Sequence, residues 1–98
     1  MYARVTTIEF SPEQPDEAAM IFDNVRPTLE QLGGFKGLVM LSGVDSRSIV
    51  AITLWETAAD LEAASPVLET VKEAETLYRQ VEAKGSVRYQ VAGSHLNL

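Results

Sequence analysis

The chain has 98 residues, of which 46% are hydrophobic, contains no cysteine and carries a formal net charge of −6. A chain of this length is expected to fold as one domain over residues 1–98, and without cysteine it has no disulfide framework, thiolate metal site or cysteine nucleophile. The acidic balance, with basic residues scattered along the chain, argues against nucleic-acid binding, which requires basic patches that neutralise phosphates.

The sequence also argues against a membrane partner. No apolar run approaches the roughly 20 residues needed to span a bilayer. The first residues, Met1–Arg4, lead directly into a strand-like segment, which is not the pattern of a signal peptide. We therefore expect a cytoplasmic location.

The first predicted strand covers Tyr2–Phe10, which is rich in β-branched and aromatic residues. Ser11, followed three residues later by Gln14, forms a capping-box pattern, so a helix is expected to follow the strand. Pro12 suits the first helical position, and a start near Pro15 is equally compatible with the pattern.

This first helix is expected to end at about Leu32, because Gly33 or Gly34 can adopt the left-handed conformation that closes a helix. Pro27 lies inside the helix and should kink it. Apolar residues recur at helical spacing and would face the core. They are Ala18, Ile21 or Phe22, Val25, Leu29 and Leu32.

Two strands follow, Phe35–Leu41 and Ile49–Trp55, and the turn-rich segment 42–46 should join them into a hairpin. Both strands are hydrophobic on both faces, whereas a half-solvated strand alternates apolar and polar residues. The first strand carries Phe35, Val39 and Leu41 on one face and Leu38 and Met40 on the other. The second carries Ile49, Ala51 and Trp55 on one face and Val50, Ile52 and Leu54 on the other.

A second helix is expected to begin after Thr57, whose hydroxyl can cap it, with Asp60 three residues later. Ser65-Pro66 should break or kink this helix, because Ser65 can cap a new helix that begins at Pro66. The apolar stripe would consist of Leu61, Ala64, Leu68, Val71, Ala74, Leu77 or Tyr78, and Val81.

The solvent face of this helix is expected to be charged, with Glu75 and Arg79 as a favourable i,i+4 pair. The other charged residues of that face are Glu62, Glu69, Glu73 and Glu82. Lys84 would lie in the last turn and Gly85 would form the cap. Val87, Tyr89 and Val91 alternate as in a final strand, and the tail Gly93–Leu98 would be loose or used by a partner chain.

The element order β-α-β-β-α-β predicts a ferredoxin-like α+β sandwich, with both helices on one face of an antiparallel sheet. The opposite face would be a large apolar surface exposed to water. We therefore expect a homodimer in which two sheets pack face to face, as a dimeric α/β barrel.

Two short motifs support this fold. Leu32-Gly33-Gly34-Phe35-Lys36-Gly37 is similar to the PGFxG segment that leads into the second strand of a known family, and Ile52-Thr53-Leu54-Trp55-Glu56-Thr57 is similar to its xxxWES segment. Pro27 also falls where many members have a proline. The chain thus resembles the antibiotic biosynthesis monooxygenase-like (ABM) domains of the dimeric α/β-barrel superfamily.

The resemblance implies a pocket between the sheet and the helices of each subunit. It also implies a cofactor-independent monooxygenase that oxidises a small aromatic or polyketide-like substrate with oxygen, without metal or flavin. Two alternatives stay open. One is a non-catalytic dimeric module that binds a small ligand or a partner, and the other is an isomerase-like or lyase-like enzyme with a carboxylate base such as Glu9.

Haem degradation, which some relatives of that family perform, is not expected. The haem-degrading members use an Asn in the first strand and a Trp and a His in the second helix. This chain offers threonine (Thr6 or Thr7) in the strand, alanine (Ala63 or Ala64) at the Trp position, and Lys72 or Ala74 near the His position.

The candidate ligand-binding residues are Trp55, Tyr89, Arg4, Arg88 and Tyr78. An arginine at the edge of a pocket can hold a carboxylate or phenolate through paired N–H donors, and a tyrosine can donate a hydrogen bond to a ligand oxygen. Each also has a structural interpretation, as core packing for Trp55 and as a solvated rim for the others. No metal site is predicted, since His95 is the only histidine and lies near the end of the chain.

Overall fold

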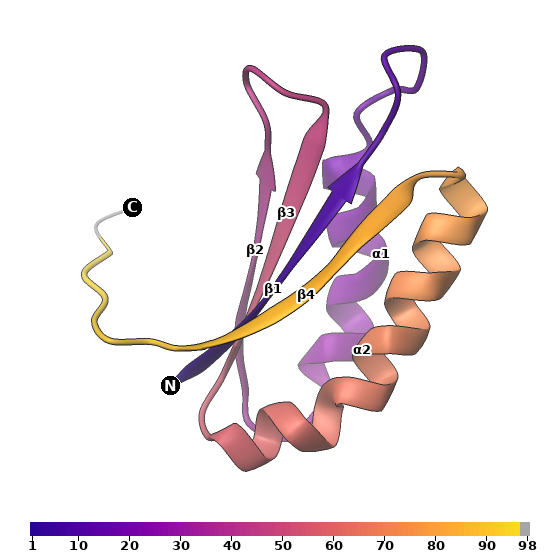
Figure 1. The fold of residues 1–98 in the computed structure, drawn as a ribbon. Coiled ribbons are helices and arrows are strands. Elements are labelled where there is room, and N and C mark those ends of the chain that lie inside the picture. The colour runs from indigo at the N-terminus through magenta and orange to yellow at the C-terminus, as the bar shows by residue number, and fades with distance from the viewer. Residues whose placement is uncertain (97–98) are drawn as a thin grey trace.

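The computed structural model describes residues 1–96, which form a four-stranded antiparallel sheet and two helices (Figure 1). The elements are β1 (Tyr2–Glu9), α1 (Ala18–Glu30), β2 (Phe35–Ser42), β3 (Ser48–Trp55), α2 (Ala58–Arg79) and β4 (Glu82–Gln90). The strands are arranged in the order β2-β3-β1-β4. This confirms the predicted β-α-β-β-α-β order and the ferredoxin-like α+β fold.

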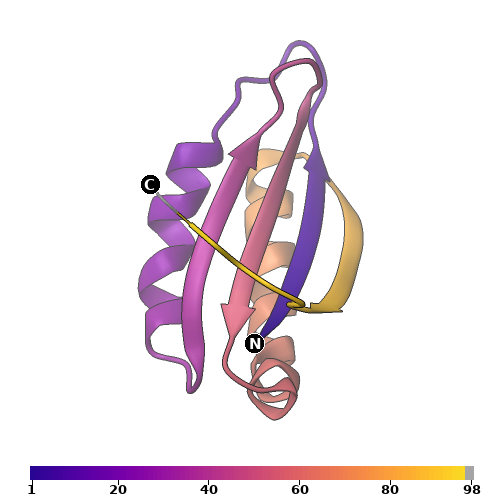
Figure 2. The same cartoon turned by 90° about the vertical axis from the view of Figure 1, so that its left-hand side faces the viewer.

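Both helices pack on the same face of the sheet, and no helix or strand within residues 1–96 covers the opposite face (Figures 1 and 2). The core lies between the helices and the sheet, and Trp55 and Leu29 are its most deeply buried large side chains. The predicted stripe of α1 is confirmed, since Ala18, Ile21, Val25 and Leu29 are all buried. Burial of such a stripe, rather than local helix propensity, supplies most of the stability of short helices.

The uncovered face of the sheet is apolar, as the two-sided strands predict. Val39, Leu41, Val87 and Tyr89 have exposed fractions between 42% and 54%. After Gln90 the chain leaves the sheet on this same uncovered side, away from the helices (Figure 1). Within residues 93–96 it forms no regular structure, and the rest of the predicted tail lies outside the described residues.

Phe35 differs from its predicted placement on the face of Val39 and Leu41. The pairing of β2 with β3 shifts between Phe35 and Gly37, so that one residue of β2 has no partner on β3. Such an irregularity reverses the alternation of side chains across it. Phe35 therefore packs on the core, where its ring meets the ring of Trp55 edge to face with centroids 5.5 Å apart.

The first helix begins later than Pro12, at Ala18. The backbone N–H of Ser11 donates a hydrogen bond to Gln14 Oε1, as a capping box requires. However, Gln14 Nε2 also donates a hydrogen bond of 2.8 Å to the Gln80 carbonyl at the end of α2. The N–H of Ala18 instead donates to Asp16 Oδ1 over 2.9 Å. Residues 11–17 are therefore a loop fastened to α2, and Asp16 satisfies the N–H group that opens the helix.

The second helix begins as predicted, since Thr57 Oγ1 accepts the N–H of Asp60. Ser65 does not cap a new helix, because its hydroxyl donates to the Leu61 carbonyl one turn earlier. The helix runs unbroken through Pro66, and its axis bends partway along its length (Figure 1). The expected interruption is thus a bend, which is a usual effect of an internal proline.

The end of α2 lies at Arg79, before the predicted cap at Gly85. Gln80 adopts a left-handed conformation with φ +56°, and the N–H groups of Gln80 and Val81 donate to carbonyls of the last turn. Val81, the residue directly before β4, packs against the core. This closing motif satisfies the final carbonyls without glycine, so that Lys84 and Gly85 lie in the strand.

Replacing Gly34 with alanine should destabilise the fold by about 1–3 kcal/mol. Gly34 has φ +77°, and an added Cβ would lie 2.6 Å from Asp60 Cβ at the start of α2. Denaturant unfolding followed by circular dichroism measures the loss. Gly33→Ala is the control, because a Cβ at Gly33 meets no atom within 4 Å. Equal unfolding midpoints for the two variants would contradict the prediction.

Candidate functional site

A cavity of about 70 Å³ lies between the sheet and the two helices. Its wall is mostly apolar and draws on β1, α1, β2, β3 and α2. The apolar lining residues are Ile8, Ile21, Val25, Leu29, Leu38, Met40, Ala51, Leu68 and Val71, and the polar ones are Arg4, Thr6, Thr53, Lys72 and Glu75. An apolar cavity with a few convergent polar groups is the usual form of a small-molecule site.

Two cations border this cavity and share one carboxylate outside it. Arg4, in the middle of β1, is only 6% exposed and forms an ion pair with Glu69 of α2. Lys72 Nζ lies 2.9 Å from Glu69 Oε2. Glu69 is half exposed, does not line the cavity and supplies one negative charge beside these two cations.

The pKa directions fit this arrangement. Burial lowers the pKa of the Arg4 guanidinium, and the neighbouring Glu69 carboxylate opposes that shift. The hydrogen bond from Lys72 lowers the pKa of Glu69, with the charges of Lys72 and Arg4 acting in the same direction. Both groups therefore keep their charges at neutral pH, since guanidinium begins from a very high pKa.

A second group of ion pairs involves Glu75, the third charged residue of the cavity wall. Arg79 Nε donates 2.9 Å to Glu75 Oε2, and the same guanidinium pairs with Glu17, just before α1. The Arg79 side chain is 6% exposed. The predicted i,i+4 pair thus exists, but its placement on the solvent face was wrong.

The helical spacing explains this difference. Lys72, Glu75 and Arg79 continue the buried stripe of Leu61, Ala64 and Leu68 at intervals of three or four residues. Leu77 and Tyr78, one of which was expected on the apolar face, are each 81% exposed. The C-terminal half of α2 therefore turns charged residues toward the sheet, where their ion pairs compensate for burial.

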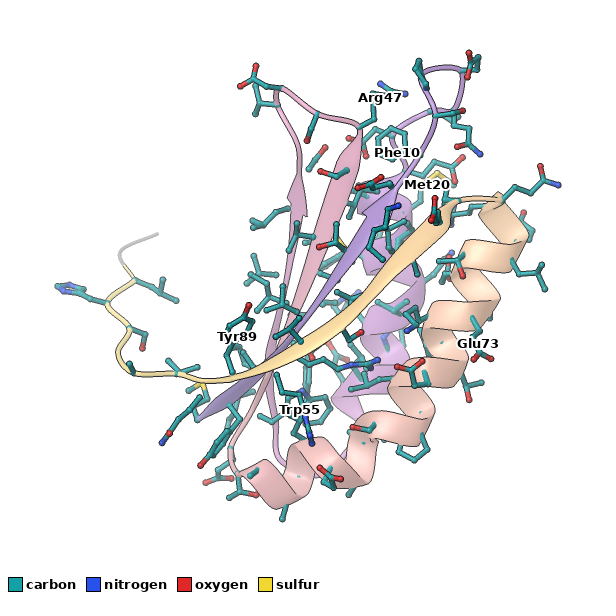
Figure 3. All side chains as sticks on the ribbon, in the orientation of Figure 1. Phe10, Met20, Arg47, Trp55, Glu73 and Tyr89 are labelled. Atoms are coloured by element: carbon teal, nitrogen blue, oxygen red, sulfur yellow. The ribbon has the colours of Figure 1, made fainter. Side chains whose placement is uncertain are left out.

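Two threonine hydroxyls complete the polar part of the cavity wall. Thr53 Oγ1, on β3, accepts a hydrogen bond of 2.9 Å from Trp55 Nε1. Thr6 Oγ1, on β1, is 2.7 Å from Ser86 Oγ on β4. Trp55 itself is fully buried and does not line the cavity, but its indole bonds to Thr53, which does. Figure 3 shows Trp55 between the sheet and the first part of α2.

The structure does not bring the five sequence-predicted residues together. Arg4 lines the cavity and Trp55 lies behind Thr53. Arg88 is exposed and pairs with Glu62 of α2, while Tyr89 lies on the uncovered side of the sheet (Figure 3). Tyr78 is exposed on α2, with the Arg79 guanidinium 5.6 Å from its ring centre.

Another pocket lies at the edge of the sheet and contains two of those residues, Arg88 and Tyr89. It has a volume of about 250 Å³, and its wall also includes Tyr2 and the start of α2. Its charged residues, Arg88 and Glu62, already pair with each other and are exposed. The cavity at Arg4 lies between the sheet and both helices and is lined mainly by apolar residues, so it is the stronger candidate.

Sequence reasoning missed Thr53, Lys72 and Glu75 as cavity residues. Lys72 and Glu75 could have been found from the sequence, because the buried stripe of α2, continued past Leu68 at helical spacing, places both on the core side. Among residues 1–96, no three His, Cys, Asp or Glu side chains gather where they could hold a metal ion. In the same part of the chain, neither helix is both long and apolar enough to cross a membrane.

The sequence matches no protein-family profile and no curated protein. The fold is similar to solved structures. A monooxygenase from the gene ActVA-Orf6 of Streptomyces coelicolor, in complex with nanaomycin D, is 16% identical with a TM-score of 0.71, over 99% of this chain and 92% of that one. SnoaB, a cofactor-independent oxygenase from Streptomyces nogalater, is 17% identical with a TM-score of 0.72, over 95% and 94%.

A third similar structure is the haem degrader MhuD from Mycobacterium tuberculosis, with two haems bound. It is 19% identical with a TM-score of 0.68, over 97% of this chain and 99% of that one. All three matches extend over nearly the whole of both chains. Because the sequence identities are low, these matches show a similar fold and nothing about activity. The chain therefore has the fold of the ABM-like domains, as its motifs predict.

Proposed function

We propose that the protein is a cofactor-independent monooxygenase whose substrate is a small aromatic molecule bound in the cavity at Arg4. The observation that carries this proposal is the apolar cavity between the sheet and the helices, which has Arg4 and Lys72 among its lining residues. The fold shared with ActVA-Orf6 and SnoaB supports it, since both are described as oxygenases.

The chemistry that such a cavity could support is direct reaction of an electron-rich ring with oxygen. A phenol that loses its proton becomes a stronger electron donor, and nearby cations stabilise the anion. At an activated CH₂ group of such a ring system, two C–H bonds break and one C=O bond forms. Carbon loses four electrons, and O₂ gains them as one oxygen enters the product and the other leaves as water.

The size of the cavity limits the substrate. About 70 Å³ is well below the roughly 300–1,000 Å³ of common ligand sites. A single ring would require side chains in the wall to move, and Met40 is suited to this because methionine is flexible. A macrocycle such as haem would require the helices to separate from the sheet, so we propose a small substrate in spite of the likeness to MhuD.

Filling the cavity should abolish oxygenase activity without unfolding the protein. The test measures oxygen uptake by the wild type and by the variant Ala51→Leu, with a panel of electron-rich phenols and dihydroquinones as substrates. The substitution adds bulk to the cavity wall, which Ala51 lines. We expect uptake to fall at least about tenfold in that variant, at a stability cost of about 1–3 kcal/mol. Ala74→Leu, at an exposed position of α2, is the control. Absence of uptake by wild type over the whole panel would overturn the proposal.

A non-catalytic dimeric binding module is the second candidate. It is favoured by the small volume of the cavity and by the apolar face of the sheet, which suits a second copy of the chain. This candidate predicts that small aromatic ligands raise the melting temperature while no oxygen is consumed.

A further inference from the structure

We propose that the cavity at Arg4 is a binding site for dioxygen, which it holds through dispersion contacts with its apolar wall and without any polar group. The choice of dioxygen among apolar molecules of this size rests on the proposed function. The inference adds the place where the smaller of the two reactants is held.

The volume of the cavity carries the first step. An engineered apolar cavity of about 150 Å³ in another protein binds benzene or xenon. The cavity between the sheet and the helices has a volume of about 70 Å³, which is roughly half as large. An aromatic ring would enter it only after side chains of the wall move, whereas a molecule of two heavy atoms has room in the structure as it stands.

The three charged residues of the wall direct their charged groups to partners outside it. Arg4 and Lys72 both pair with Glu69, and the carboxylate of Glu75 accepts a hydrogen bond from Arg79. Neither Glu69 nor Arg79 lines the cavity. These side chains are therefore engaged with one another, and the surface that the wall presents to the cavity is almost entirely carbon.

The two threonine hydroxyls of the wall are engaged in the same way. Thr53 Oγ1 accepts the indole N–H of Trp55, and Thr6 Oγ1 shares a hydrogen bond with Ser86 Oγ. Trp55 and Ser86 do not line the cavity, and within residues 1–96 no buried side-chain nitrogen or oxygen lacks a hydrogen-bond partner. Because a water molecule needs about two to four polar partners to occupy such a site, the cavity favours an apolar molecule over water.

The test uses dioxygen itself as the probe, because it is paramagnetic and speeds the relaxation of nearby nuclei. Methyl NMR spectra of the intact protein are recorded under dioxygen pressure and under the same pressure of nitrogen, which is diamagnetic. We expect the relaxation rates of the Leu29 and Leu68 methyl groups, which line the cavity, to rise at least about threefold more than that of the Ala64 methyl group.

Ala64 is the matched reference, because its exposed fraction of 4% lies between those of Leu29 and Leu68, and it does not line the cavity. Dioxygen dissolved in the surrounding water would therefore affect the three residues alike. Equal rises at all three would overturn the inference.

Variants at Ala51 separate binding in the cavity from penetration of the whole core. Ala51→Leu fills the cavity and should remove the excess relaxation at Leu29, whereas Ala74→Leu, at an exposed position of α2, should keep it. Ala51→Ser nearly keeps the volume and adds a hydroxyl that gives water a partner, so it should reduce the excess. An excess that persists in both Ala51 variants would overturn the inference.

Comparison with the oxygen-uptake assay separates this inference from the proposed function. Excess relaxation at Leu29 and Leu68 without oxygen uptake on any phenol or dihydroquinone of the panel would support the dioxygen site while removing the oxygenase proposal. Oxygen uptake without the excess would overturn the dioxygen site and leave the oxygenase proposal standing.

Discussion

Trp55→Ala is expected to lower the free energy of unfolding by about 3–5 kcal/mol, the usual cost of removing a large buried aromatic side chain. Trp55 is 0% exposed, packs edge to face on Phe35 and donates its indole N–H to Thr53. The substitution would leave a cavity where the end of the sheet meets α2. Small domains have only about 5–15 kcal/mol of total stability, so this loss would remove a large share of it.

Urea unfolding followed by far-ultraviolet circular dichroism measures this loss, since the variant lacks the chain's single tryptophan. Trp55→Phe is the matched comparison, because it keeps an aromatic ring and removes the indole N–H. We expect it to cost less than half as much as the alanine variant. A loss below about 1 kcal/mol for Trp55→Ala would show that the site collapses around the missing ring and would contradict the packing described above.

Val39→Glu on the uncovered face of the sheet is expected to convert a homodimer to monomers. Two sheets packed face to face would bury Val39 together with Leu41 of the same strand, and a carboxylate at position 39 would lose its hydration without a partner. Within one subunit Val39 is 42% exposed, so the substitution leaves the helix-covered core intact. Sedimentation equilibrium at several protein concentrations measures the change in mass.

Leu77→Glu is the control for this experiment, because Leu77 is a more exposed apolar residue on α2, on the helical layer. It should leave the association state unchanged. A wild-type protein that stays monomeric at tens of micromolar, or equal association of both variants, would rule out the dimer. The monomer would then need another partner for an apolar sheet face of this extent.

The sequence was most informative where one periodicity held over a whole element. Alternating and two-sided apolar patterns located β1, β2 and β3, and the 3.6-residue stripe located α1 and the first half of α2. The errors fell where a local contact overrode the pattern. Phe35 changed faces because of a shift in strand pairing, and Gln80 closed α2 in a conformation that glycine normally adopts.

The candidate site was less predictable for a related reason. Charged residues such as Lys72, Glu75 and Arg79 are assigned to solvent by default, because isolated burial of a charge is costly. Lys72 pairs with Glu69 on the same helix, Glu69 also pairs with Arg4 of β1, and Arg79 pairs with Glu17, just before α1. Only the fold shows that these side chains meet, so the sequence could name Arg4 but not the group around it.

The central place of β1 in the sheet has a consequence for synthesis in the cell. Of the four strands β1 is synthesised first, yet it pairs with β3 and β4, and Tyr2 lies opposite Gln90. Until the last strand has emerged, one edge of β1 has unpaired backbone N–H and C=O groups, which invite pairing with other chains. Nascent or truncated chains that lack β4 should therefore depend on chaperones or associate with one another, while the complete chain covers this edge itself.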